Sequence, residues 1–235
     1  MYKNSDQTPF RTILIIPAYN EEGCIERVIN KVKVDIPDID YVVVNDGSRD
    51  STLEILIKNK YNYIDLPVNL GLHGAIQTGL IYAHINNYDC AIQFDGDGQH
   101  RTEYVQPLVK AIQGKSCDVA IGSRFAECKR PHSIRMIGSR FISLAIFLIT
   151  GKNIYDPTSG MRAYNKELIE LLATNSNYGP EPDTVSYLLL KKKKIIEIQV
   201  EMDERISGVS YLGISASIKY MARMLTSILL IQPFR

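Results

Sequence analysis

The sequence predicts an α/β fold, with a mostly parallel central sheet, helices on both faces and amphipathic helices at the C-terminus. Short β-branched runs, such as residues 12–16 and 41–44, alternate with segments whose apolar residues recur every three or four positions. Strands and helices that alternate in this way build parallel sheets covered on both faces. A length of 235 residues suits one such domain with an appendage.

Each expected element has a local signal. Strands are expected over residues 12–16, 41–44, 63–66, 90–94, 119–121 and 195–200, and helices over 21–32, 53–57, 71–83 and 105–112. Pro17 is expected to end the first strand, because proline lacks a backbone N–H. Ile25, Val28 and Val32 share one face of the first helix, which therefore packs on the sheet.

Two later segments differ from this alternation. Residues 130–151 and 213–232 are apolar, flanked by basic side chains and expected to be helical. The cleanest apolar run, 141–149, is too short for a membrane span, which needs about 20 apolar residues. We therefore expect a main domain over 1–205, with 130–151 as an interfacial helical insertion, and an amphipathic segment over 206–235 that faces a membrane or a partner.

Composition and charge exclude several classes of protein. A net charge of +1 gives no general attraction to nucleic acid, and the lysine run 191–194 is expected to be a solvated turn. The four cysteines form no CxxC pair and no zinc spacing, which is typical of reduced thiols. The N-terminus has no signal-peptide core. We expect a cytoplasmic protein that is peripheral on the cytoplasmic face of the membrane.

Two carboxylates follow an expected strand directly. Asp95 and Asp97 flank Gly96 at the end of the run 90–94, and ligands of open α/β sheets bind beyond such strand ends. Carboxylate oxygens suit Mg²⁺ or Mn²⁺, and such a cation can hold a diphosphate. The chain has no Rossmann glycine fingerprint after its first strand and no P-loop, H-E-x-x-H or G-x-S-x-G motif. The sequence therefore predicts a metal site rather than a glycine cradle.

Two other strand ends carry polar residues. Residues 17–22 follow the first expected strand, and residues 45–48 follow the second. Because parallel strands end at one edge of the sheet, these groups are expected near Asp95 and Asp97. There an aromatic ring can cover a nucleobase, and carboxylates can accept hydrogen bonds from base N–H groups and ribose hydroxyls.

This ordered set of motifs resembles the family 2 glycosyltransferases with a GT-A fold, and more narrowly the polyprenol-phosphate sugar synthases such as the dolichol-phosphate mannose synthases. The resemblance covers roughly residues 11–210. Its segments are PAYNEE at 17–22, NDGSRDST at 45–52, NLGLHGA at 69–75, DGDGQH at 95–100, GSRF at 122–125, DPTSGMRAYN at 156–165 and DERISGVS at 203–210. It implies an inverting, metal-dependent transfer of a sugar from a nucleotide-diphosphate sugar to a polyprenyl phosphate.

Site roles follow from the resemblance position by position. Nucleotide-sugar binding is implied for Pro17, Ala18, Tyr19, Glu21, Asp46, Asp95 and Gly96. Metal binding, to Mg²⁺ or Mn²⁺, is implied for Asp95, Asp97 and Gln99. The implied catalytic residues are Asp97, Arg124 and Arg205. His100 borders the metal motif and is expected to shape it rather than to bind the ion.

The acceptor decides whether the reaction needs a base. A phosphate monoester is largely ionised near neutrality, since its second pKa is about 6, so it needs cations beside it instead. The candidates for that role are Arg124, Arg135, Arg140 and Arg205. A saccharide hydroxyl, as in capsule or cell-wall polysaccharide synthesis, requires a base. The candidates for that base are Asp156, Glu181 and Asp183. The arginines favour the phosphate, and both acceptors stay open.

The C-terminal segment favours contact with a lipid. On a helix over 213–232, one apolar stripe is formed by Ile214, Ile218, Met221, Leu225 and Ile228. Lys219 and Arg223 lie outside it, as in helices that lie in the bilayer interface. The alternatives are packing on the domain or on a second copy in a homo-oligomer, and a small partner protein that anchors the chain. A non-catalytic nucleotide-sugar-binding scaffold is the remaining rival.

Overall fold

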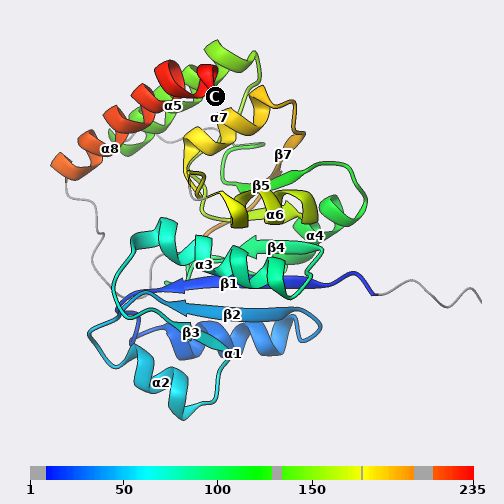
Figure 1. The fold of residues 1–235 in the computed structure, drawn as a ribbon, viewed down its shortest axis with the longest axis vertical. Coiled ribbons are helices and arrows are strands. Elements are labelled where there is room, and N and C mark those ends of the chain that lie inside the picture. The colour runs from blue at the N-terminus through cyan, green and yellow to red at the C-terminus, as the bar shows by residue number, and fades with distance from the viewer. Residues whose placement is uncertain (1–8, 129–133, 176, 204–213) are drawn as a thin grey trace, which may run out of the picture.

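The computed structural model describes residues 9–128, 134–175, 177–203 and 214–235. This part of the chain forms one seven-stranded sheet in the order β3-β2-β1-β4-β6-β5-β7, with helices on both sides (Figure 1). The mostly parallel α/β architecture expected from the sequence is confirmed, because β1 pairs in parallel with both β2 and β4.

The element bounds agree with the sequence up to residue 121 and add elements beyond it. The strands are β1 Thr12–Ala18, β2 Asp40–Asn45, β3 Tyr63–Asp65, β4 Cys90–Gln93, β5 Val119–Ser123, β6 Arg162–Asn165 and β7 Ile195–Gln199. The α-helices are α1 Ile25–Asp35, α2 Thr52–Lys58, α3 Gly71–Ile85, α4 Val105–Gln113, α5 Ile134–Thr150, α6 Lys166–Thr174, α7 Pro182–Leu190 and α8 Ile214–Thr226. Shorter turns are η1 Thr102–Tyr104, the π-helical η2 Ser227–Ile231 and η3 Gln232–Phe234.

Strand β1 runs through Pro17 instead of ending before it, which corrects the sequence-based bound. Pro17 pairs with Val44 of β2. On the other side, Phe94 N–H donates to the Ile15 carbonyl, so every second residue of β1 directs its backbone polar groups toward β4. Strand β4 has ended at Gln93, opposite Ile15, before Pro17 is reached. The ladder therefore requires no N–H from this proline.

Strand β6 breaks the parallel pattern and was not expected from the sequence. It pairs antiparallel with both β4 and β5, and thus separates two parallel halves of the sheet. Its four residues begin with Arg162, a charged side chain that is nevertheless fully buried. A run so short, opened by arginine, carries no apolar alternation that would predict a strand. Helices α6 and α7 follow it and were not expected either.

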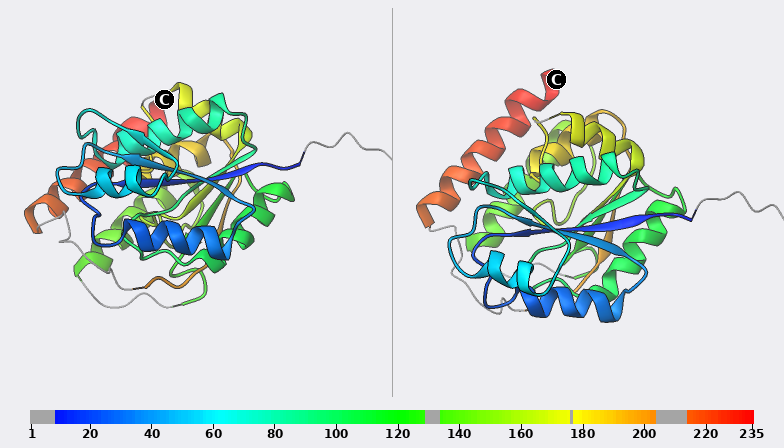
Figure 2. Two further views of the ribbon diagram at one scale, coloured as in Figure 1. Left: turned by 90° about the horizontal axis from the view of Figure 1, so that it is seen from below. Right: turned by 60° about the horizontal axis from the view of Figure 1, so that its bottom comes forward.

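The side chains of each strand alternate between two hydrophobic clusters. In β1, Ile13 and Ile15 join the cluster covered by α3, α5, α6 and α7, whereas Leu14 and Ile16 join the one covered by α1, α2 and α4. Figure 2 shows these helix layers from two further directions. The predicted apolar face of α1 is confirmed, because Ile25, Val28, Ile29 and Val32 are all buried. Both faces of the central strands are therefore covered by helices, whereas the edge strands β3 and β7 are only partly buried.

The C-terminal helix packs on the domain, which is one of the alternatives that the sequence left open. Ile228 is fully buried and Met221 is partly buried, so the described part of the predicted bilayer-facing stripe lies against the protein. Helix α8 and η2 contact α5, and η2 also contacts α7. The side chains of Ile214 and Ile218 lie outside the described set. Within the described ranges, no helix combines the length and apolarity that crossing a membrane requires.

Thiol reactivity tests this packing. Cys24, Cys90 and Cys117 are buried and Cys128 is exposed, and burial raises the pKa of the Cys90 and Cys117 thiols. Because the thiolate is the reactive form, we expect Cys128 alone to react rapidly with a disulfide reagent in the native protein, and all four after unfolding. Rapid labelling of Cys90 in the folded protein, located by peptide mass spectrometry, would contradict the structure.

Candidate active site at the carboxyl ends of β1, β2 and β4

A cavity of about 650 Å³ opens at the carboxyl ends of β1, β2 and β4. Its wall is completed by the loop before β6, by the start of α7 and by Tyr220 of α8. Asp97 lines the cavity. So do all seven residues that the resemblance implies for nucleotide-sugar binding, which are Pro17, Ala18, Tyr19, Glu21, Asp46, Asp95 and Gly96. The strand ends thus bring the three motifs to one place, while the individual roles stay predictions.

The first two motifs hold each other in place. Asn20 N–H donates to Ser48 Oγ at 3.0 Å, and Arg49 N–H donates to Asn20 Oδ1 at 2.8 Å. In the same way, Glu22 N–H donates to Asp50 Oδ2 at 3.1 Å. Asn20 itself has a φ of 56°, a left-handed conformation that asparagine tolerates better than most residues. Several polar side chains of 45–52 therefore brace the Tyr19 loop.

Asp46 joins the end of β2 to the start of α3. Its carboxylate accepts the Leu70 N–H at 2.6 Å, and the residue is almost fully buried on the cavity wall. Burial raises the pKa of Asp46, an effect opposed by the N–H groups of Leu70 and Gly71. One oxygen thus holds the loop over residues 66–70, and Asp46 also lines the cavity.

Asp95 is fixed from two sides. His100 Nδ1 accepts the Asp95 backbone N–H at 2.9 Å, and His100 Nε2 lies 3.4 Å from Asp95 Oδ2. A Cβ at position 160 would lie 2.7 Å from the same Oδ2, so only Gly160 leaves room for the carboxylate. Gly96 is required for a similar reason, because a Cβ there would lie 2.8 Å from the Pro17 carbonyl oxygen. His100 thus shapes the motif, as expected.

Asp97 is 4% exposed, and its Oδ1 accepts the Gln99 N–H at 3.0 Å. Gln99 directs its side-chain amide to the Asp203 carbonyl at 3.4 Å and is not among the residues that line the cavity. Within the described ranges there is no group of three His, Cys, Asp or Glu side chains that could hold a metal ion alone. The structure therefore brings Asp95 and Asp97 to the cavity and leaves Gln99 beside it.

The charges of the cavity wall suit a metal with an anionic ligand. The described lining residues include five carboxylates and no lysine or arginine; these acids are Glu21, Asp46, Asp95, Asp97 and Glu181. A diphosphate near such a wall would be repelled, by about 4 kcal/mol per unit pair at 4 Å and an effective dielectric constant of 20. Mg²⁺ in proteins commonly uses one or two carboxylates and completes its shell with substrate phosphates and water. Asp95 and Asp97 fit that donor set.

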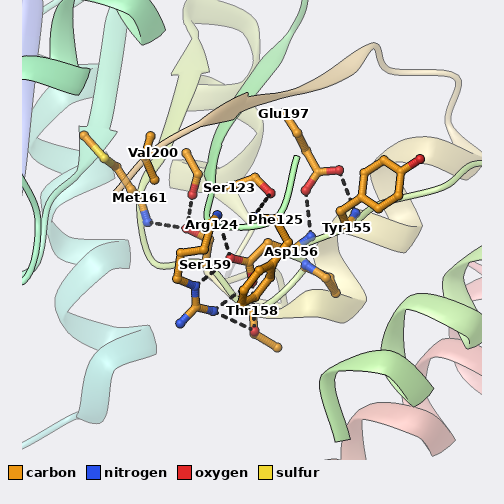
Figure 3. A network of polar contacts seen from close by, with 12 residues as sticks. Ser123, Arg124, Phe125, Tyr155, Asp156, Thr158, Ser159, Met161, Glu197 and Val200 are labelled. Carbon is orange, nitrogen blue, oxygen red and sulfur yellow. Dashed lines mark hydrogen bonds and ion pairs between the residues drawn. The ribbon is translucent and has the colours of Figure 1, made fainter. Parts of the chain in front are cut away.

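Arg124 and Asp156 form the central ion pair beside the cavity (Figure 3). Asp156 is fully buried; it accepts from Arg124 Nε at 2.7 Å, Nη2 at 2.9 Å and the backbone N–H at 3.1 Å. Burial alone lowers the pKa of Arg124, but the bonds and charge of Asp156, with a contribution from Asp95, raise it overall. The arginine is therefore a fixed cation.

Glu197 of β7 holds the Asp156 loop from behind (Figure 3). Its carboxylate accepts the N–H groups of Tyr155 and Asp156, both at 2.6 Å. Burial raises the pKa of Glu197, and these two N–H groups oppose the shift. Asp156 is thus held on both its backbone and its side chain, and is poorly placed to accept a proton from a substrate.

The other two candidate bases are also engaged. Tyr220 O–H donates to Glu181 Oε2 at 2.7 Å, and Arg223 Nη2 lies 3.3 Å from Glu181 Oε1. Asp183 accepts from Ser227 Oγ at 2.7 Å. Of the three candidates, Glu181 is the one that lines the cavity. These bonds attach α8 and η2 to the start of α7.

Of the other three predicted acceptor-phosphate residues, only the side chain of Arg140 belongs to the described part of the chain. Arg205 falls outside the described residues, and so does the side chain of Arg135. Arg140 lies exposed on α5 and is not part of the cavity wall.

Sequence reasoning missed other parts of the wall. Tyr220 gave no local signal, because tyrosines are dispersed along the chain. Thr158 and Ser159 also line the cavity. They belong to the DPTSGMRAYN segment at 156–165, but sequence reasoning assigned them no role.

Comparison with known proteins identifies the family. The geometry is that of an α/β enzyme with carboxylates at its strand ends, and residues 13–172 match Glycosyl transferase family 2. The chain therefore belongs to this family and is a glycosyltransferase. It is 30% identical over 205 residues to a UDP-N-acetylglucosamine–dolichyl-phosphate N-acetylglucosaminyltransferase of Methanococcus voltae, covering 79% of this chain and 81% of that protein. It is also 30% identical to an undecaprenyl-phosphate mannosyltransferase of Micrococcus luteus, covering 85% and 86%.

A solved structure shows the same fold. Glucosyl-3-phosphoglycerate synthase of Mycobacterium tuberculosis, bound to phosphoglyceric acid, matches with a TM-score of 0.68 at 19% identity, covering 93% of this chain and 80% of that one. The same enzyme with Mn²⁺, UDP-glucose and phosphoglyceric acid matches with a TM-score of 0.67 at 17% identity, covering 95% and 79%. The predicted GT-A fold is confirmed by this similarity.

The Arg124–Asp156 pair can be tested by denaturation. Asp156→Ala leaves a largely buried guanidinium without its partner, so the free energy of unfolding should fall by about 2–4 kcal/mol. Glu167→Ala removes an ion pair with Lys193 in which the glutamate is exposed, and should cost less than about 1 kcal/mol. Urea unfolding measures both. Equal losses in the two variants would show that Arg124 needs no partner.

Proposed function

We propose that this glycosyltransferase transfers a sugar from a nucleotide-diphosphate sugar to polyprenyl phosphate at a membrane surface, with inversion at the anomeric carbon. The observation that carries the proposal is the convergence of Tyr19, Asp46, Asp95 and Asp97 on one acidic cavity. The two relatives described above, which act on dolichyl and undecaprenyl phosphate by name, support the acceptor.

The donor end of the reaction follows from the cavity wall. Tyr19 and Asp46 lie on the β1–β2 side and would hold the nucleoside, the ring against the base and the carboxylate toward base or ribose donors. Asp95 and Asp97 would hold Mg²⁺ or Mn²⁺ with the diphosphate. When bound, that ion stabilises the negative charge that develops on the leaving diphosphate. The Mn²⁺ and UDP-glucose in the solved neighbour support this assignment.

A phosphate acceptor is consistent with the contacts of the candidate bases, because their carboxylates already have partners within the protein. Asp156 is held by Arg124, and Asp183 is held by Ser227. An ionised phosphate needs no proton acceptor, so the reaction can proceed without them. The charge of Asp95 contributes to the raised pKa of Arg124, and we propose that Arg124 attracts the acceptor phosphate to the attacking position.

Glu181 is the residue that supports the alternative acceptor, a saccharide hydroxyl. It lines the cavity, so it could act as the base for a saccharide hydroxyl in capsule or cell-wall polysaccharide synthesis. Its two carboxylate oxygens are already engaged by the Tyr220 hydroxyl and by Arg223, so it would have to release a partner to take a proton from a substrate.

Membrane contact is supported by α5 and the C-terminus. One face of α5 exposes apolar side chains at spacings of four, three and four residues; they are Ile137, Phe141, Leu144 and Leu148. Beyond α8, the chain exposes Leu229, Leu230, Ile231 and Phe234. Helix α5 contacts both α8 and η2, and Figures 1 and 2 show these helices on one flank of the molecule. Such a surface can lie in the bilayer interface. We propose peripheral binding to the cytoplasmic face; a small anchoring partner or a second copy remains a prediction.

Formation of a labelled glycolipid tests the activity. Wild-type protein with polyprenyl phosphate, Mn²⁺ and a panel of labelled UDP- and GDP-sugars should give a lipid-linked sugar. Asp97→Asn weakens the metal site and should lower kcat by at least about 100-fold. Asp38→Asn, at an exposed position outside the cavity, should leave the rate unchanged. Transfer to a saccharide hydroxyl, lost in Glu181→Gln, would favour the alternative acceptor and contradict the proposal.

Vesicle binding tests the surface on α5. Phe141→Asp combined with Leu148→Asp should weaken binding to vesicles of phosphatidylglycerol and phosphatidylethanolamine by at least about 10-fold, because both side chains are exposed on the apolar face. Ile85→Asp replaces an equally exposed apolar residue on α3 and should bind as the wild type does. Equal binding by the double variant and the wild type in a sedimentation assay would refute the assignment of this face.

A further inference from the structure

One polar side chain on the cavity wall lacks a partner. Gln93 is the last residue of β4; it lines the cavity and is only 1% exposed. Its Oε1 is buried and accepts no hydrogen bond from any residue that the structure describes. Buried polar atoms are nearly always paired with protein or ligand, and an unpaired one is unfavourable. A leucine or methionine would fill the same volume without this cost.

The neighbouring arginine does not supply the missing bond. Arg162 of β6 is the antiparallel partner of Gln93, so the two side chains lie on the same face of the sheet. Its guanidinium donates instead to three backbone carbonyls, those of Ser159 at 3.0 Å, Pro157 at 2.7 Å and Glu181 at 3.3 Å. These bonds fix the cavity wall next to Gln93. The carboxamide is left as a rigidly placed group that faces the cavity.

The order of the strands indicates which part of the donor Gln93 meets. The nucleotide residues of β1 and β2 lie on one side of β4, and the loop over 158–160 and Glu181 lie toward β6 on the other. Gln93 ends β4 and Asp95 follows it in the loop, and both residues line the cavity. A diphosphate held at Asp95 and Asp97 therefore directs its sugar toward the β6 side.

We propose that Gln93 recognises a hydroxyl group of the transferred sugar, with Oε1 accepting the hydroxyl hydrogen. The inference rests on the proposed function and deepens it, because it assigns selection of the sugar to β4 rather than to the nucleotide loops. A site with a buried polar group rejects ligands that leave this group unpaired. The donor is accordingly a pyranose with a free hydroxyl at the position that reaches the end of β4.

Calorimetric binding to the full chain tests the inference. With Mn²⁺ present, Gln93→Leu should bind free UDP or GDP within about threefold of wild type. It should bind the preferred nucleotide sugar about 10- to 100-fold more weakly, the range expected for one lost hydrogen bond in a closed site. Gln77→Leu is the matched control, since Gln77 also has a buried unpaired Oε1, but donates to the Leu172 carbonyl outside the cavity. It should leave both affinities unchanged.

Deoxy analogues of the nucleotide sugar identify the hydroxyl. One analogue should bind wild type and Gln93→Leu equally, because the contact is absent in both complexes. A Gln93→Leu variant that melts lower and loses free nucleotide and nucleotide sugar in equal proportion would overturn the inference, since that is the behaviour of a structural residue. Unchanged affinity for the nucleotide sugar would also overturn it. A wild type that binds no nucleoside diphosphate at all would refute the proposed function itself, and this inference with it.

Discussion

The fixed position of the Asp95 carboxylate is the constraint on which the rest of the site depends. His100 holds its backbone and side chain, and Gly160 leaves the only space into which its Oδ2 fits. These contacts come from the loop after β4 and from the loop before β6, so the antiparallel strand contributes directly to the site. A larger side chain at position 160 would therefore collide with the Asp95 carboxylate.

The negative charge of the cavity wall limits which ligands can bind there. The described cavity wall is acidic, although the proposed donor carries a diphosphate and the proposed acceptor a phosphate. Without a cation such a wall repels both ligands. The described arginines nearby have other partners: Arg124 binds Asp156, and Arg162 binds backbone carbonyls. In the proposed function, a divalent ion held by Asp95 and Asp97 would resolve this conflict, and it would tie donor binding to metal binding.

The sequence predicted the parts of this molecule that have local signals. The apolar face of α1 and the polar residues at the ends of β1, β2 and β4 follow from spacing within single segments. Strand β6 did not, because its fully buried Arg162 is satisfied by carbonyls that only the tertiary fold brings together. The sequence left the orientation of α8 open for a similar reason. Its stripe suited a bilayer and the protein core equally well, and contact with α5 and α7 decided for the core at Ile228.

In the proposed function the metal and the diphosphate depend on each other for binding, and the binding of each can be measured separately. Linkage requires that each ligand strengthens the other by the same factor. Electron paramagnetic resonance of Mn²⁺, titrated with and without UDP or GDP, measures this factor directly. Mn²⁺ should bind at least about tenfold more tightly when the nucleotide is present. Equal Mn²⁺ affinity in both titrations, or tight nucleotide binding in the presence of a chelator, would contradict this dependence.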